Sequence, residues 1–122
     1  MEAPLRAVIA FIIGRLIIGS QAWAILDHDR GHPVFIDGSV EPSGIRVYIH
    51  ELGTYISGHG NGTYYQLFEH RRAIELSFVL SAAGKSFAGF DQRGPFRFFG
   101  EVAGAEIRIF DFEDMASHCY TF

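Results

Sequence analysis

The stretch from Phe87 to Phe122 reads FAGFDQRGPFRFFGEVAGAEIRIFDFEDMASHCYTF, and it predicts two successive β-hairpins. In the first hairpin a strand ends at Phe90, a turn at Gly94-Pro95 follows, and a return strand begins at Phe96. The same order of strand, polar turn and return strand recurs around Phe110, 20 residues after Phe90. A supersecondary unit of about 21 residues therefore repeats in this stretch.

This unit can be followed back through most of the chain. Its reference positions, at spacings of 22, 20, 22 and 20 residues, are Leu26, Tyr48, Phe68, Phe90 and Phe110. The residues one and three positions before each of them are apolar except at Gly89, which indicates one buried strand face with a period of two. Five hairpins predict an all-β domain of about ten short antiparallel strands. Because closure removes exposed sheet edges, we expect a closed or nearly closed meander, either a barrel or a ring of hairpins.

The composition fits a single globular domain over residues 1–122. The chain has 12 Phe, 5 Tyr and 14 Gly, and this excess favours pleated strands joined by tight turns. Ten basic and 14 acidic residues give a formal charge of −4 without any basic run, which argues against nucleic acid or an anionic membrane as partner. The single Cys119 cannot form an intramolecular disulfide, and its place in an alternating strand indicates an inert thiol.

The first 19 residues are the most apolar segment, and we expect them to form buried strands ahead of the five hairpins in residues 20–122. Gly14 and Gly19 divide this segment into β-branched blocks of strand length, and no helical period with a cap is evident. A signal sequence or membrane anchor in residues 5–24 is the alternative, but Arg15 would cost roughly 2.5 to 3.5 kcal/mol in a bilayer. We therefore expect a cytoplasmic protein, with export or membrane anchoring as the alternative.

Three histidines occupy the same place in successive units, two residues after the reference position: His28, His50 and His70. In a closed meander the turns after these positions lie at one rim, where three imidazoles could converge on a metal ion. Histidines are also common in solvated surface turns. A metal-dependent enzyme or metal-binding protein that uses this rim is therefore the alternative hypothesis, and the leading hypothesis requires no cofactor.

The remaining polar motifs favour structural roles. Residues 58–62 are rich in glycine, but they align with links between hairpins at 38–44 and 100–104 and lack the lysine and helix that follow a phosphate-binding loop. Four carboxylates directly follow reference positions, where they are suited to capping turn N–H groups: Asp27, Glu69, Asp91 and Asp111. No activated nucleophile with a nearby base is evident, so an enzyme has little support.

The leading functional prediction is a non-catalytic binding or protein-interaction module. Its candidate face carries the aromatic residues Tyr48, Phe68, Phe90 and Phe110 together with Arg46 and Arg108. Faces of this kind bind small molecules or partner proteins. A cavity inside the meander is the other binding route, and packing as a second core layer is the structural explanation for the same rings. A homo-oligomer is compatible with either route.

The repeat makes a prediction about stability at two adjacent residues. Ile109→Asp should unfold the protein or make it insoluble, because an unpaired charge in an apolar core costs several kcal/mol, against about 5 to 15 kcal/mol for a whole domain. Arg108→Asp should leave a folded protein with a change of about 0.5 kcal/mol, since alternation places Arg108 on the opposite face. Urea unfolding followed by circular dichroism measures both changes. Equal tolerance of the two substitutions would show that the register is wrong.

Overall fold

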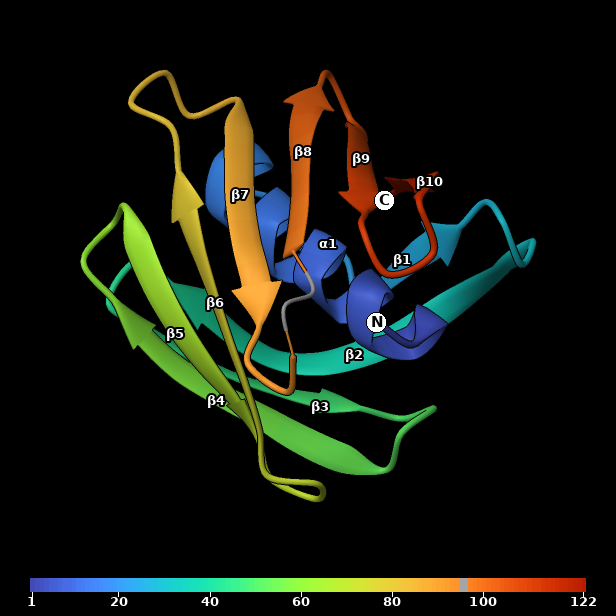
Figure 1. The fold of residues 1–122 in the computed structure, drawn as a ribbon, viewed down its shortest axis with the longest axis vertical. Coiled ribbons are helices and arrows are strands. Elements are labelled where there is room, and N and C mark those ends of the chain that lie inside the picture. Colours follow the sequence, from blue (N-terminus) through green and yellow to red (C-terminus); the bar gives the residue numbers. More distant parts are fainter. Residues whose placement is uncertain (95–96) are drawn as a thin grey trace.

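The described residues, 1–94 and 97–122 of a computed structural model, form ten antiparallel strands closed into a barrel around helix α1 (Figure 1). The first elements are α1 (Ala3–Ile18), β1 (Ala24–Asp27), β2 (His32–Glu41), β3 (Gly44–Ile49), β4 (Thr54–Gly60) and β5 (Tyr64–Glu69). The others are β6 (Ile74–Leu80), β7 (Ser86–Asp91), β8 (Arg97–Ala103), β9 (Glu106–Asp111) and β10 (Ala116–Thr121).

Each strand pairs with its neighbours in the sequence, and β10 returns to β1, where Thr121 pairs with Leu26. The predicted all-β closed meander of five hairpins is therefore confirmed, and it is a barrel. The predicted alternation also holds, because Ile109 is fully buried and Arg108 faces outward. Trp23 is an exception to the buried columns at 62% exposure, since it precedes the first residue of β1.

The prediction of buried strands in residues 1–19 is wrong, because Ala3–Ile18 form α1. Pro4 stands in the first turn, where its missing N–H group is tolerated, and Gly19 ends the helix in the left-handed region with a φ of 77°. The helix is apolar on all sides, so its sequence lacks the alternation of faces by which a surface helix is recognised. In the described part of the chain, no helix combines the length and the apolar character needed to cross a membrane.

Helix α1 fills the inside of the barrel. A ten-stranded barrel is wider than the inward side chains of its strands can fill alone. The side chains from Leu5 to Ile13, apart from Arg6, are completely buried against the strands. Gly14 lets the ring of Phe122 pack directly on the helix backbone, because a Cβ atom at this position would overlap that ring. The space that an internal ligand cavity would need is therefore occupied by α1.

The return strands run further than predicted. β2, β4 and β8 continue through glycines that the sequence placed in links, so the turns after them shrink to residues 42–43, 61–63 and 104–105. A side chain at Gly38, Gly58 or Gly100 would overlap the backbone of the neighbouring strand, and glycine at such positions lets a strand coil tightly. The predicted turn at Gly94-Pro95 and the predicted strand start at Phe96 fall on residues 95–96, outside the described residues.

Gly100→Ala should destabilise the barrel by about 2 to 3 kcal/mol, because the new methyl group would overlap the carbonyl oxygen of Arg108 on β9. Gly44→Ala is the matched control, since no atom lies within 4 Å of the methyl group that it would add. We expect the control to change the free energy of unfolding by less than about 1 kcal/mol in either direction. Urea unfolding monitored by circular dichroism measures both values. Equal losses in the two variants would contradict the close approach of β8 to β9.

Candidate functional site

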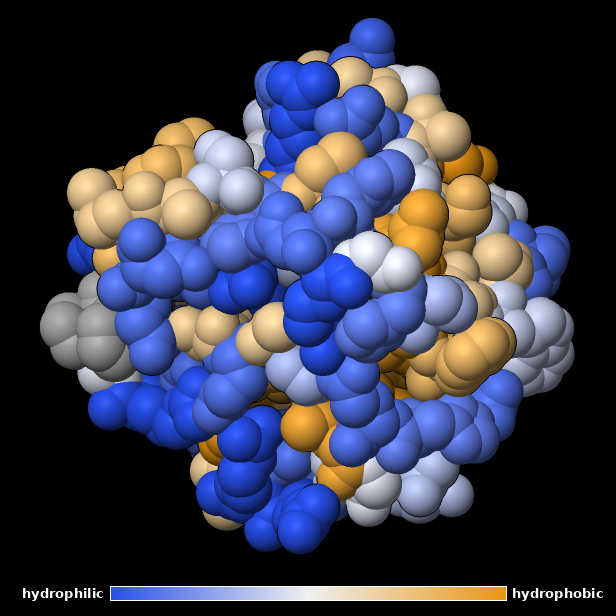
Figure 2. All heavy atoms as spheres, turned by 90° about the vertical axis from the view of Figure 1, so that its right-hand side faces the viewer, coloured by the Kyte–Doolittle hydropathy of each residue, from blue (hydrophilic) through white to orange (hydrophobic). Residues whose placement is uncertain are grey.

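The predicted aromatic face is a belt around the outside of the barrel. Tyr48, Phe68, Phe90 and Phe110 lie on β3, β5, β7 and β9, and all four are half-buried or exposed. Another strand separates each ring from the next, so neighbouring members stand about 10 Å apart and do not form one patch. They lie on the opposite side of the barrel wall from α1, which means that they are not a second core layer. On the side that faces right in Figure 1, hydrophilic residues dominate the surface and hydrophobic ones form smaller areas between them (Figure 2).

Three rings gather where β8 meets β9, and we call Phe99, Phe110 and Phe112 the phenylalanine patch. The register of the two strands places Phe99 directly opposite Phe110. The ring centroids are 5.3 Å apart for Phe99 and Phe110, 5.7 Å for Phe99 and Phe112, and 5.1 Å for Phe110 and Phe112. Phe99 is 47% exposed and Phe112 is 43% exposed. The three rings therefore support one another while presenting a large apolar surface to water.

A groove of about 440 Å³ runs beside the phenylalanine patch on the outer side of β6, β7 and β8. Apolar side chains line most of it, among them Tyr64, Val79 and Phe90, and the patch contributes Phe99 and Phe112. Arg97, which is exposed, adds a positive charge to this lining. A cation beside an apolar groove favours a ligand that is both apolar and anionic.

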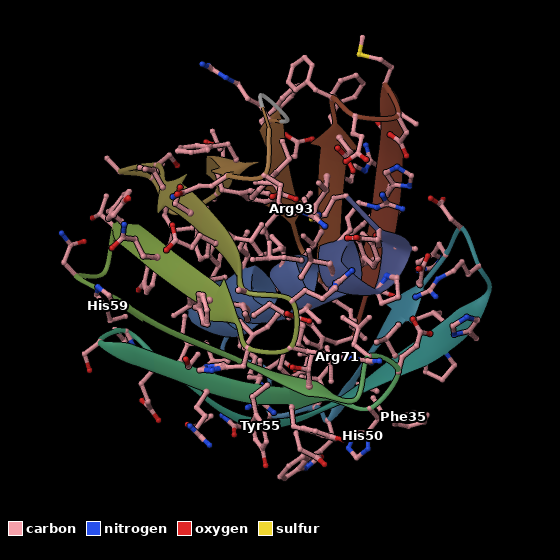
Figure 3. All side chains as sticks on the ribbon, turned by 60° about the horizontal axis from the view of Figure 1, so that its bottom comes forward. Phe35, His50, Tyr55, His59, Arg71 and Arg93 are labelled. Atoms are coloured by element: carbon pink, nitrogen blue, oxygen red, sulfur yellow. The ribbon has the colours of Figure 1, made fainter. Side chains whose placement is uncertain are left out.

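A second aromatic site, the tyrosine patch, consists of Arg46, Tyr48 and Tyr55 on the outer side of β3 and β4. The guanidinium carbon of Arg46 lies 4.7 Å from the centre of the Tyr55 ring, and the two tyrosine rings are 4.9 Å apart. A cation–π contact at an exposed site contributes about 0.5 to 1 kcal/mol. Tyr55 projects outward from this wall (Figure 3). Arg46 is thus already engaged with a ring of the protein itself.

The predicted histidine rim does not come together. The Nε2 atoms of His28, His50 and His70 lie 2.8 Å from Thr121 Oγ1, 2.5 Å from Asp37 Oδ2 and 2.6 Å from Ser57 Oγ, respectively. Each partner stands on the strand next to the histidine, so one cross-strand contact recurs around the barrel. In the fifth unit the rings of Phe112 and Phe99 make the equivalent contact. Among the described residues, no group of three His, Cys, Asp or Glu side chains is arranged to hold a metal ion.

Two side chains that could act as nucleophiles, Ser57 and Cys119, each form a hydrogen bond within the protein. The Ser57–His70 hydrogen bond has the length of a nucleophile–base pair, but the same contact recurs with an aspartate or a threonine in place of the serine. The Sγ atom of Cys119 lies 3.0 Å from Glu106 Oε1, and burial together with this hydrogen bond raises the pKa of the thiol to about 11. Cys119 therefore stays protonated and is a weak nucleophile.

Buried carboxylates hold the rim at which α1 begins. Asp27, Glu69, Asp91 and Asp111 accept hydrogen bonds from backbone N–H groups of the following turns, so the predicted caps are confirmed. Each also pairs with a guanidinium group, and these pairs are Asp27–Arg30, Glu69–Arg72, Asp91–Arg93 and Asp111–Arg6. Figure 3 shows Arg71 and Arg93 at this rim. Because a buried carboxylate neutralises each of the four paired arginines, this set of arginines does not offer a site for an anion.

Glu2 connects α1 to the same rim. Its Oε1 atom accepts hydrogen bonds from Arg72 Nη1 at 2.8 Å and from Arg93 Nη1 at 2.9 Å. The hydrogen bonds from Arg93 are the main cause that lowers the pKa of Glu2 from 4.5 to about 2. Deeper in the barrel, Arg6 Nε donates to the hydroxyl oxygen of Tyr120 at 2.9 Å, and burial raises the pKa of that phenol. The neutral phenol is therefore available as an acceptor for the buried guanidinium of α1.

The predicted face lacks residues of these sites, above all Phe99, Phe112, Tyr55 and Arg97. Three of them lie on return strands, and Phe112 lies just beyond the end of β9. The sequence did contain a signal for Phe99, because a two-residue turn at 104–105 sets the register that places it opposite Phe110. Of the predicted arginines, Arg46 joins a patch, whereas Arg108 pairs with Glu106 at 2.6 Å.

Glu2→Gln should lower the free energy of unfolding at neutral pH by about 1 kcal/mol, the upper end for partly exposed ion pairs. Because the folded pKa of Glu2 is lowered, its contribution is fully present above the unfolded value near 4.5 and is lost as the pH falls towards about 2. The difference between parent and variant should therefore be constant above about pH 5 and vanish near pH 2. Urea unfolding over this pH series measures it, and a difference that persists at the acid end would contradict the assignment.

No protein-family model, curated protein or solved structure matches the chain. A function for this protein therefore has to come from the chemistry of its own residues.

Proposed function

We propose that this protein is a non-catalytic interaction module that binds an apolar, acidic segment of a partner protein at the phenylalanine patch and its groove. The observation that carries the proposal is a set of three rings in mutual contact, two of which are more than 40% exposed. Single exposed aromatic residues are common on protein surfaces. Rings that gather beside a groove are a feature of binding sites, because burying them releases water from a large apolar area.

The patch has the rigidity that a binding anchor requires. Phe99 and Phe110 stand on paired strands, so their positions are fixed before a partner arrives. Aromatic side chains have few rotatable bonds and lose little conformational entropy on binding. Complete burial of one such ring contributes about 1.5 to 3 kcal/mol, so two or three anchors suffice for a specific complex.

Arg97 supplies the selectivity of the proposed site. It lines the groove together with Phe90 and Phe99, and arginine beside aromatic residues is a typical combination in interface cores. A guanidinium group in partly apolar surroundings binds a carboxylate more strongly than it does in bulk water. A partner segment with an acidic residue next to apolar ones therefore satisfies the groove better than a neutral or basic segment.

The rest of the barrel supports an outer rather than an inner site. α1 occupies the interior, which favours the wall over an internal cavity. The histidines of the predicted metal rim and the thiol of Cys119 have partners within the protein, which favours binding over catalysis.

Two fluorescently labelled peptides test the proposal. In the acidic peptide two phenylalanines flank an aspartate, and in the matched basic peptide a lysine replaces this aspartate. Phe99→Gln should raise the Kd of the acidic peptide about tenfold, because one ring loses its apolar contact. Arg97→Gln should raise this Kd about threefold and remove the preference for the acidic peptide over the basic one. Fluorescence anisotropy measures each Kd.

Tyr55→Gln in the tyrosine patch is the matched control and should bind both peptides as the parent does. Circular dichroism confirms that each variant is folded. The proposal is wrong if the parent binds both peptides equally, or if Phe99→Gln leaves the acidic peptide bound as before. A dimer detected by sedimentation velocity and abolished by Phe99→Gln would assign the patch to a second copy of this chain.

A further inference from the structure

A separate cleft of about 310 Å³ lies on the outer side of β4, β5 and β6. Its lining includes Ser57, His59, Gln66, Phe68, Glu75 and Gln92. Strand register creates this grouping, because Ser57 and Glu75 are the cross-strand neighbours of Phe68. The volume falls at the lower end of the range for small-molecule sites, about 300 to 1,000 Å³.

Four polar side chains of this cleft are not used by the protein itself. Within residues 1–94 and 97–122, the side chains of His59, Gln66, Glu75 and Gln92 make no hydrogen bond to another protein group. His59 differs in this respect from His28, His50 and His70, each of which has a hydrogen-bond partner within the protein. Two amides, a carboxylate and an imidazole thus offer both donors and acceptors to a ligand.

Phe68 provides an apolar surface that is held in place. The ring of His70 meets the ring of Phe68 edge-on, with centroids 5.0 Å apart and an angle of 89°. His70 is fixed in turn by its hydrogen bond of 2.6 Å to Ser57. A ring that is fixed before binding loses little entropy when a ligand packs on it.

The charges of the lining narrow the class of ligand. The described lining residues include one carboxylate and neither lysine nor arginine, so an anionic ligand finds no counter-charge. A neutral ligand with one apolar face and several hydroxyl groups matches all the groups present. A pyranose sugar has this form, because its C–H face packs on an aromatic ring while its hydroxyls exchange hydrogen bonds with amides and carboxylates.

We propose that this cleft binds a neutral sugar of one or two pyranose rings, with Phe68 as the stacking surface and Gln66, Glu75 and Gln92 as hydrogen-bonding groups. The inference goes beyond the proposed interaction module, since none of these residues belongs to the phenylalanine patch or its groove. Loss of either site leaves the other intact.

Nuclear magnetic resonance titration of the labelled protein tests this inference, with the methyl glycosides of glucose, galactose and mannose and with cellobiose as probes. We expect at least one probe to shift the amide signals of β4 and β5, with a Kd of about 1 mM. Phe68→Leu should raise this Kd about tenfold or more, and Gln66→Ala should raise it about fivefold.

Phe35→Leu and Gln21→Ala are the matched controls, because they make the same changes at exposed residues outside both proposed sites. Both should bind the sugar as the parent does. The absence of shifts with all four probes at about 50 mM overturns the inference, as does a Kd that is unchanged in Gln66→Ala. Shifts with lysine methyl ester that disappear in Glu75→Gln would assign the cleft to a cationic amine instead.

Discussion

A ten-stranded barrel encloses more space than its own side chains can fill, and α1 fills the remainder. The helix meets the wall on every side, so it has to be apolar all round, and its polar groups have to reach a rim. Arg6 reaches Asp111 at 3.1 Å at the beginning of the helix. Near the other end, Arg15 donates to the carbonyl oxygen of Ala22 at 2.7 Å. These two arginines fix the depth at which the helix lies in the barrel.

Because the helix fills the interior, the five hairpins resemble one another in their inward-facing residues and differ in their outward-facing residues. Most inward positions are apolar because they pack around the helix, and the rim positions carry carboxylates that cap the turns. Outward positions carry no such constraint, and the neighbours of each reference ring differ. Tyr48 lies beside Tyr55, Phe68 between Ser57 and Glu75, and Phe110 beside Phe99. The repeat therefore builds one scaffold, and its outward variations build separate surfaces on it.

The sequence alone predicts the closed meander of strands, but it does not predict the helix that lies inside it. The period of two that places Val47 and Ile109 on one strand face is a local sequence signal, and both residues are indeed buried in the structure. The residues of α1 carry no such signal, because isoleucine and valine suit a buried strand as well as a buried helix, and only the surrounding wall decides between them. His50 and His70 were correctly placed in equivalent positions, but the circumference of the barrel keeps them apart. The pairing of Phe99 with Phe110 depends on register, which periodicity alone does not specify.

The closure of the barrel also sets an order of events for the growing chain. α1 precedes every strand, yet the wall around it is completed only by the last hairpin, β9 and β10. β1 joins β10 through two residue pairs, whereas β9 joins β10 through six. This short seam links the two ends of the fold, so it carries the largest loss of chain entropy for the fewest hydrogen bonds. Until it closes, the most apolar segment of the protein lacks a complete cover, and exposed apolar surface of this kind makes a partly folded chain prone to aggregation.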